Sequence, residues 1–225
     1  EPSRHWPDRI EIVLHLDPTD LTRSTGYGAL LYRDGRANWR QGRDSGGEID
    51  VAVLEIDRHA LPKQAVLQAF TPAHLAKPSQ DIEVGTPLLI VGFPMGFHDE
   101  LHHLPVVRQA VVASAYGVRF QGLGYFLTDA RTHRGTSGAP VVMHATSAPD
   151  EDPDALPWRL LGVHSGRLDM QPRDAEHDDP LGLNCAWYAD ILMTLTAEAG
   201  ATRPEPSSAD RSEPPGGESA STPPE

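Results

Sequence analysis

The sequence predicts an all-β protein built as a barrel or a sandwich, and three observations support this class. Short apolar runs recur along the chain and are separated by turns rich in glycine, proline and aspartate. Helix signals are few, and only one stretch near the C-terminus has apolar residues at helical spacing. The length of 225 residues fits one large β domain or two small barrels that share an interface.

The strands follow in order from this pattern. The first half is expected to hold four strands, at residues 10–16, 26–32, 49–56 and 66–70. The second half is expected to hold six, at residues 86–93, 106–113, 124–129, 139–144, 159–165 and 181–187. A short helix is expected at residues 189–199, because Ile191, Leu192 and Leu195 have helical spacing and Gly200 can end the helix.

Composition limits the partners that the chain can have. The net charge is −13 and no basic stripe is visible, which argues against nucleic-acid binding. No run is long and apolar enough to span a membrane. Cys185 is the only cysteine, so an internal disulfide is impossible. Because the sequence also shows no leader, we slightly favour a cytoplasmic location over the periplasm or secretion. Residues 201–225 contain no large apolar side chain and are expected to be disordered.

A glycine-rich loop lies between two of the expected strands, at residues 128–140. It places Ser137 between Thr136 and Gly138, with Gly135 two residues earlier. Glycine allows a positive φ and leaves no side chain in the way of a ligand. Such a loop can direct the amides of Gly135 and Ser137 toward one point beside the serine hydroxyl, as acyl transfer requires for its oxyanion. An ordinary glycine turn is the other interpretation.

The loop resembles the nucleophile loop of trypsin-like serine peptidases, in the form found in bacterial HtrA-type and related enzymes, and departs from it at Arg134, Thr136 and Ala139. Four further segments resemble the same family in the same order: residues 50–54, 90–96, 161–166 and 182–186. The resemblance implies two antiparallel six-stranded Greek-key barrels, here at residues 1–78 and 79–200, followed by the tail 201–225. It also implies a serine endopeptidase that acts on proteins or peptides.

In this family the serine needs a histidine base and an aspartate that orients it. Asp50 matches the aspartate that opens an apolar strand, although a turn residue before a strand is the other interpretation. His5 has the right separation from Asp50 but the wrong neighbours, and His15 lies inside a strand. We therefore expect the true histidine, together with the first strands of the first barrel, to be encoded upstream of residue 1, which leaves that barrel incomplete.

The resemblance extends to the substrate-binding residues. Glutamyl endopeptidases and exfoliative toxins have a threonine and a histidine where this chain has Thr132 and His164, and in them the pair binds an acidic side chain. Arg131 would add a third donor, and Ser165 and Gly166 would contact the substrate backbone. The sequence thus raises the hypothesis of cleavage after glutamate or aspartate. In the alternative interpretation, Arg131 points to solvent and His164 bonds the backbone.

Two further alternatives remain open at this stage. A cluster of potential metal ligands, His98, Asp99, His102 and His103, lacks a recognised ligand spacing, so we expect neither a metal nor another cofactor. The chain could also be an inactive protease-like module that binds peptides by strand addition. Nothing in the sequence bears on the oligomeric state.

Overall fold

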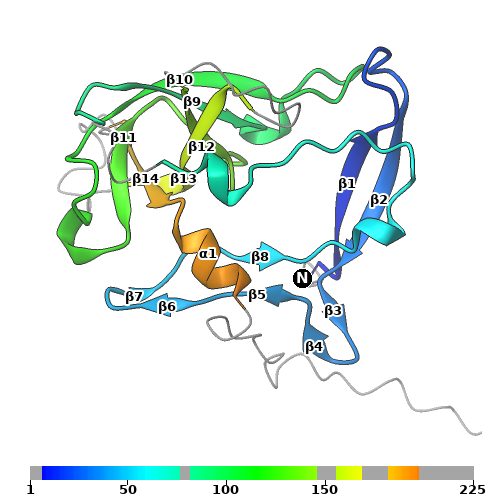
Figure 1. Cartoon of the computed structure of the whole chain (residues 1–225), viewed down its shortest axis with the longest axis horizontal. Helices are drawn as coiled ribbons and strands as arrows, with labels where there is room; N and C mark the ends of the chain where they lie inside the picture. Colours follow the sequence, from blue (N-terminus) through cyan, green and yellow to red (C-terminus); the bar gives the residue numbers. More distant parts are fainter. Residues whose placement is uncertain (1–6, 77–81, 146–155, 169–181, 198–225) are drawn as a thin grey trace, which may run out of the picture.

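The computed structural model describes residues 7–76, 82–145, 156–168 and 182–197 (Figure 1). His5 and the tail 201–225, which the sequence predicts to be disordered, lie outside these residues. The described part is mostly β, as the sequence predicts, with one short helix.

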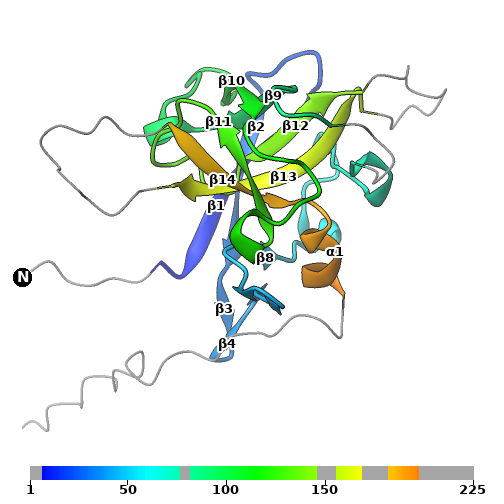
Figure 2. The ribbon, with the colours of Figure 1, turned by 90° about the vertical axis from the view of Figure 1, so that its left-hand side faces the viewer.

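Six strands of the second half form a closed antiparallel barrel (Figures 1 and 2). Around the barrel their order is β10-β11-β14-β13-β12-β9, so β12 lies beside β9 as in a Greek key. Closure gives every strand a neighbour on both sides, although β13 extends past β12, so that Gly166 and Arg167 pair with β14 alone. All six expected strands are found to within a few residues: β9 (Pro87–Gly92), β10 (Val106–Val112), β11 (Tyr125–Asp129), β12 (Pro140–His144), β13 (Trp158–Arg167) and β14 (Leu183–Tyr188).

The first half forms small sheets. Its described strands pair as four two-stranded sheets, and a second closed barrel is not seen among them. The longest pair is β1 (Arg9–His15) with β2 (Ser24–Leu30). The others join β3 (Tyr32–Arg33) with β4 (Arg36–Ala37), β5 (Trp39–Arg40) with β8 (Val53–Leu54), and β6 (Arg43–Asp44) with β7 (Gly47–Glu48).

Two strand predictions in this half differ from the structure. The run at residues 49–56 pairs only at β8, and the strand predicted at residues 66–70 is absent. Val66 donates one backbone hydrogen bond to His15, at 2.8 Å, but no ladder follows. Phe70 instead packs its ring against a buried cluster on the barrel. Side-chain packing thus holds this segment without strand pairing.

The core explains why β11 is apolar at successive positions. Phe126 points into the barrel, where it joins Ile90 and Leu161. Its neighbours Tyr125 and Leu127 point outward, because successive side chains of a strand alternate between faces. The outer face of β11 is covered by residues of the first half and by the helix, so both faces are buried.

The C-terminal helix and one ion pair connect the first half to the barrel. Helix α1 (Ile191–Thr196) is shorter than predicted, and it packs Leu195 into the outer cluster beside Ile49. Arg119, between β10 and β11, forms an ion pair with Asp44 at the end of β6. Within the described residues, no helix is long or apolar enough to span a membrane.

Candidate active site

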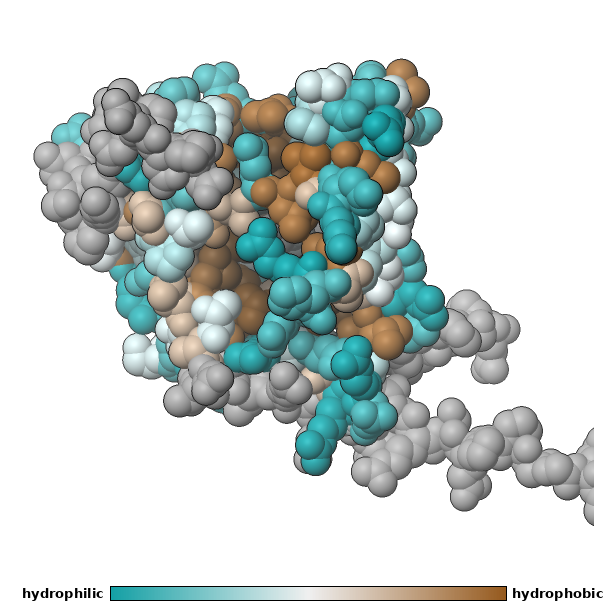
Figure 3. Space-filling model, turned by 45° about the vertical axis from the view of Figure 1, so that its right-hand side comes forward, coloured by the Kyte–Doolittle hydropathy of each residue, from teal (hydrophilic) through white to brown (hydrophobic). Residues whose placement is uncertain are grey.

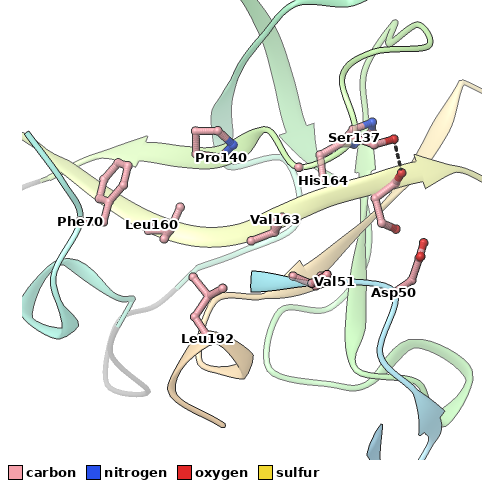
Figure 4. A pocket seen from close by; sticks show the side chains of 12 residues that line it. Asp50, Val51, Phe70, Ser137, Pro140, Leu160, Val163, His164 and Leu192 are labelled. Carbon is pink, nitrogen blue, oxygen red and sulfur yellow. Dashed lines mark hydrogen bonds between the residues drawn. The ribbon is translucent and has the colours of Figure 1, made fainter. Parts of the chain in front are cut away.

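A cleft of about 720 Å³ lies between the barrel and segments of the first half (Figure 4). It is built from segments far apart in the sequence, and it brings together Ser137 and Asp50, which the sequence analysis paired. The lining residues are Asp50, Val51, Ala52, Phe70, Ser137, Gly138, Pro140, Leu160, Val163, His164, Ser165 and Leu192.

The serine loop joins β11 to β12, as predicted, and is fixed to the neighbouring strand β13. The Gly138 amide donates to the His164 carbonyl at 2.7 Å, and the His164 amide donates to the Ala139 carbonyl at 2.9 Å. Gly135 and Gly138 both have φ of 86°, which glycine adopts without strain. The loop therefore turns sharply on either side of Ser137 and leaves that side chain exposed to the cleft.

The Ser137 hydroxyl donates to the carbonyl of Ser165 at 2.6 Å (Figure 4). A β-bulge makes this contact possible, because the register of β13 against β14 shifts between His164 and Gly166. The bulged residue is Ser165, and bulges re-aim backbone groups beside functional sites. A carbonyl accepts this hydrogen bond but cannot remove the proton, so the contact orients the hydroxyl without activating it.

Asp50 reaches the cleft because the residue before it is anchored. Ile49 is fully buried in the outer cluster with Tyr125 and Trp187, whereas Asp50 itself is exposed. Its carboxylate is close enough to act on Cys185: burial raises the pKa of that thiol, and the negative charge of Asp50 raises it further. The carboxylate thus places a negative charge at the same cleft as the serine hydroxyl.

The two amides predicted to hold an oxyanion have no acceptor among the described residues. Within the described part of the chain, neither the Gly135 nor the Ser137 amide donates a hydrogen bond to another residue. The neighbouring amides are used: Thr136 donates to the carbonyl of His133 at 3.3 Å, and Gly138 to that of His164. The loop therefore keeps two N–H donors available beside the Ser137 hydroxyl.

The predicted substrate-binding residues divide between two places. His164 and Ser165 line the cleft, but Arg131, Thr132 and Gly166 are not among its lining residues. The buried Thr132 hydroxyl donates to the side chain of Asn184 at 2.5 Å. The structure thus does not bring the three proposed donors into one pocket. The Thr132 hydroxyl has one proton, and it donates that proton to an acceptor inside the protein.

His164 is the one histidine among the described lining residues of this cleft. The residue is 2 % exposed, and its Nδ1 atom has no hydrogen-bond partner among the residues that the structure describes. Burial lowers the pKa of His164 to about 4, because a protonated imidazole there would lack the water that stabilises its charge. The ring is therefore neutral at physiological pH.

Sequence reasoning missed the apolar wall of the cleft. This wall is built from three separate segments and consists of Phe70, Leu160, Val163 and Leu192. Of these, Val163 lies in the segment that resembles a substrate-binding strand, so its role could have been found from that signal. Phe70 and Leu192 carry no local signal, because only the folded chain brings them together.

Some side chains of the histidine-rich loop after β9 contact one another. His102 Nδ1 lies 2.8 Å from a carboxylate oxygen of Asp99, and the rings of His98 and His103 stack at 6.1 Å. In the described ranges, no three histidine, cysteine or acidic side chains gather as a metal site would require.

The described residues define a β-barrel protein in which an exposed serine, flanked by Gly135 and Gly138, lines the same cleft as a carboxylate. A family model described as a trypsin-like peptidase domain matches residues 13–147, which include Asp50 and Ser137. The chain belongs to this trypsin-like peptidase family, whose general function is that of a serine-type protease. A comparison with curated proteins found no match.

Proposed function

We propose that the protein is a serine endopeptidase in which Ser137 attacks the peptide bond and Asp50 orients the general base. The observation that carries this proposal is the cleft that both residues line. The proposed base is a histidine outside the described residues, where His5 also lies. Its imidazole would occupy the space between the two side chains and would remove the proton that Ser137 now donates in its hydrogen bond to the Ser165 carbonyl.

The chemistry follows from the loop geometry. Once the base removes the proton, the Ser137 oxygen attacks the substrate carbonyl, and the negative charge moves onto the carbonyl oxygen. The amides of Gly135 and Ser137 would stabilise this oxyanion. Collapse of the intermediate transfers the proton to the leaving amine and leaves an acyl-enzyme, which water then hydrolyses.

A fluorophosphonate probe tests the nucleophile in the full chain. The probe forms a phosphorus–oxygen bond with an activated serine and releases fluoride, so labelling reports the reactive hydroxyl directly. We expect labelling of the unmodified chain, either alone or with added imidazole as a small free base that can enter the cleft. Ser137→Ala abolishes it, whereas Ser24→Ala, on β2 and away from the cleft, leaves it unchanged. Absence of labelling in both arms contradicts the proposal.

A second function is favoured by one observation. Ser137 is hydrogen-bonded to a backbone carbonyl, and His164, the only histidine at the cleft within the described residues, is buried and neutral. A chain in this state would bind peptides along β13 by strand addition without cleaving them. Peptide binding that is retained in Ser137→Ala, together with no labelling of the unmodified chain, identifies this function.

For specificity we propose an acidic residue before the cleaved bond, as in the glutamyl-endopeptidase-like members that the sequence resembles. His164 supports this, because the residue lines the cleft and its buried, neutral ring has a nitrogen without a partner among the described residues. A hydrogen bond to a charged carboxylate contributes roughly 1.5–3 kcal/mol, or about 10- to 100-fold in rate. Paired peptides with glutamate or glutamine at this position test it. His164→Leu should lower the ratio, and equal rates for both peptides in the unmodified chain refute the preference.

A further inference from the structure

The turn that follows β9 packs against the serine loop and forms a backbone hydrogen bond with it. This turn contains the short 3₁₀ element η3 (Pro94–Gly96). The Met95 amide donates to the carbonyl of Arg134 at 2.5 Å. We infer that Met95 is a positioning residue, whose backbone fixes the direction of the Gly135 amide in the oxyanion hole. This inference rests on the proposed peptidase function.

This hydrogen bond fixes the orientation of the peptide group between Arg134 and Gly135. No described peptide bond is cis, so the carbonyl of Arg134 and the N–H of Gly135 point in opposite directions from one planar group. Because the carbonyl faces Met95, the Gly135 N–H faces away from the turn and has no acceptor in the described part of the protein. If this peptide rotated by half a turn, its carbonyl would take the place of the N–H and would repel an oxyanion.

Close packing holds the peptide in this orientation. A side-chain carbon added at Gly135 would lie 2.7 Å from the carbonyl oxygen of Phe93 and 3.1 Å from the Met95 nitrogen. Both distances are too short for an ordinary contact, so the turn and the loop approach each other only because residue 135 is glycine. The turn therefore acts as a rigid support behind the oxyanion loop.

The backbone of Met95, and not its side chain, performs this function. Its side chain is 77 % exposed, while its φ of 55° is uncommon for a residue other than glycine. Neighbouring hydrogen bonds hold the conformation: the Gly96 amide donates to the Phe93 carbonyl at 2.9 Å, and His98 Nδ1 lies 2.7 Å from the Gly96 carbonyl. The histidine-rich loop thus contributes to the shape of the turn.

Two substitutions at Met95 separate the backbone from the side chain. Met95→Pro removes the N–H donor and forbids a positive φ, whereas Met95→Gly keeps the donor and accepts the conformation. In fluorophosphonate labelling of the full chain, we expect Met95→Pro to be about 10²- to 10³-fold slower, the loss typical of one oxyanion donor. Met95→Gly should label at a rate within a few-fold of the unmodified chain.

A second pair of variants keeps the test informative if Met95→Pro does not fold. Gly135→Ala forces a contact with the turn, whereas Gly117→Ala has similar backbone strain, at φ of 84°, but nothing within 4 Å. We expect slow labelling only in Gly135→Ala, with the affinity for an unreactive peptide unchanged. Unmodified labelling rates in both Met95→Pro and Gly135→Ala overturn the inference. Failure of the unmodified chain to label would instead refute the proposed function.

Discussion

Replacing His164 should remove most of the acid sensitivity of folding between pH 6.5 and pH 4.5. Burial lowers the pKa of His164 to about 4 from the usual 6.5. Between these two values the unfolded chain binds a proton that the folded chain does not, so the free energy of unfolding falls as the pH falls. The two pKa values correspond to a loss of about 2.5 kcal/mol between pH 7.5 and pH 4.5.

Denaturation in urea, followed by tryptophan fluorescence, measures this loss, since Trp187 is buried in the outer cluster. The variant His164→Leu cannot bind the proton and should show a nearly flat profile in this range. The matched control His59→Leu replaces an exposed histidine in a 3₁₀ turn and should keep the full slope. Carboxylates such as Asp44, whose pKa is lowered, act at lower pH and do not interfere. An unchanged slope in His164→Leu refutes the reasoning.

Three further predictions concern the barrel, and urea denaturation measures each. Gly162→Ala places a carbon 2.5 Å from the backbone of β14 and should lower the free energy of unfolding by at least about 2 kcal/mol. The control Gly26→Ala has open space around the added carbon and should change this free energy by no more than about 0.5 kcal/mol. Equal effects of the two substitutions contradict the steric argument. Thr132→Val leaves the buried Asn184 oxygen without its donor and should cost about 1–3 kcal/mol, so a neutral result contradicts the importance of this bond. Phe126→Ala empties the centre of the barrel and should cost about 3–5 kcal/mol, and a loss below 1 kcal/mol argues against a close-packed core.

The sequence predicted the second half of the fold well because the pattern there is local. Each barrel strand is an apolar run between turns, and closure lets every such run pair with two neighbours. The run at residues 66–70 has the same composition, yet it finds no partner ladder and stays irregular. Composition alone does not reveal whether a partner exists, so the first half could not be predicted equally well.

The site shows the same division between local and long-range information. The loop around Ser137 could be predicted because its glycines and flanking strands are adjacent in the chain. The hydrogen bond of the Thr132 hydroxyl could not be predicted, because its acceptor, Asn184, is 52 residues away on β14. The acidic-pocket hypothesis assumed that Thr132 faces the substrate, and the competing internal hydrogen bond removes that donor.

The position of Asp50 depends on the barrel more than on the sheets of the first half. The hairpin of β6 and β7 that precedes it is a two-stranded sheet, and such a pair is only marginally stable by itself. The contacts that hold this segment on the barrel include the ion pair of Asp44 with Arg119 and the burial of Ile49 beside Trp187. The barrel therefore supports both sides of the cleft, since it carries Ser137 on its own loop and fixes the segment that presents Asp50.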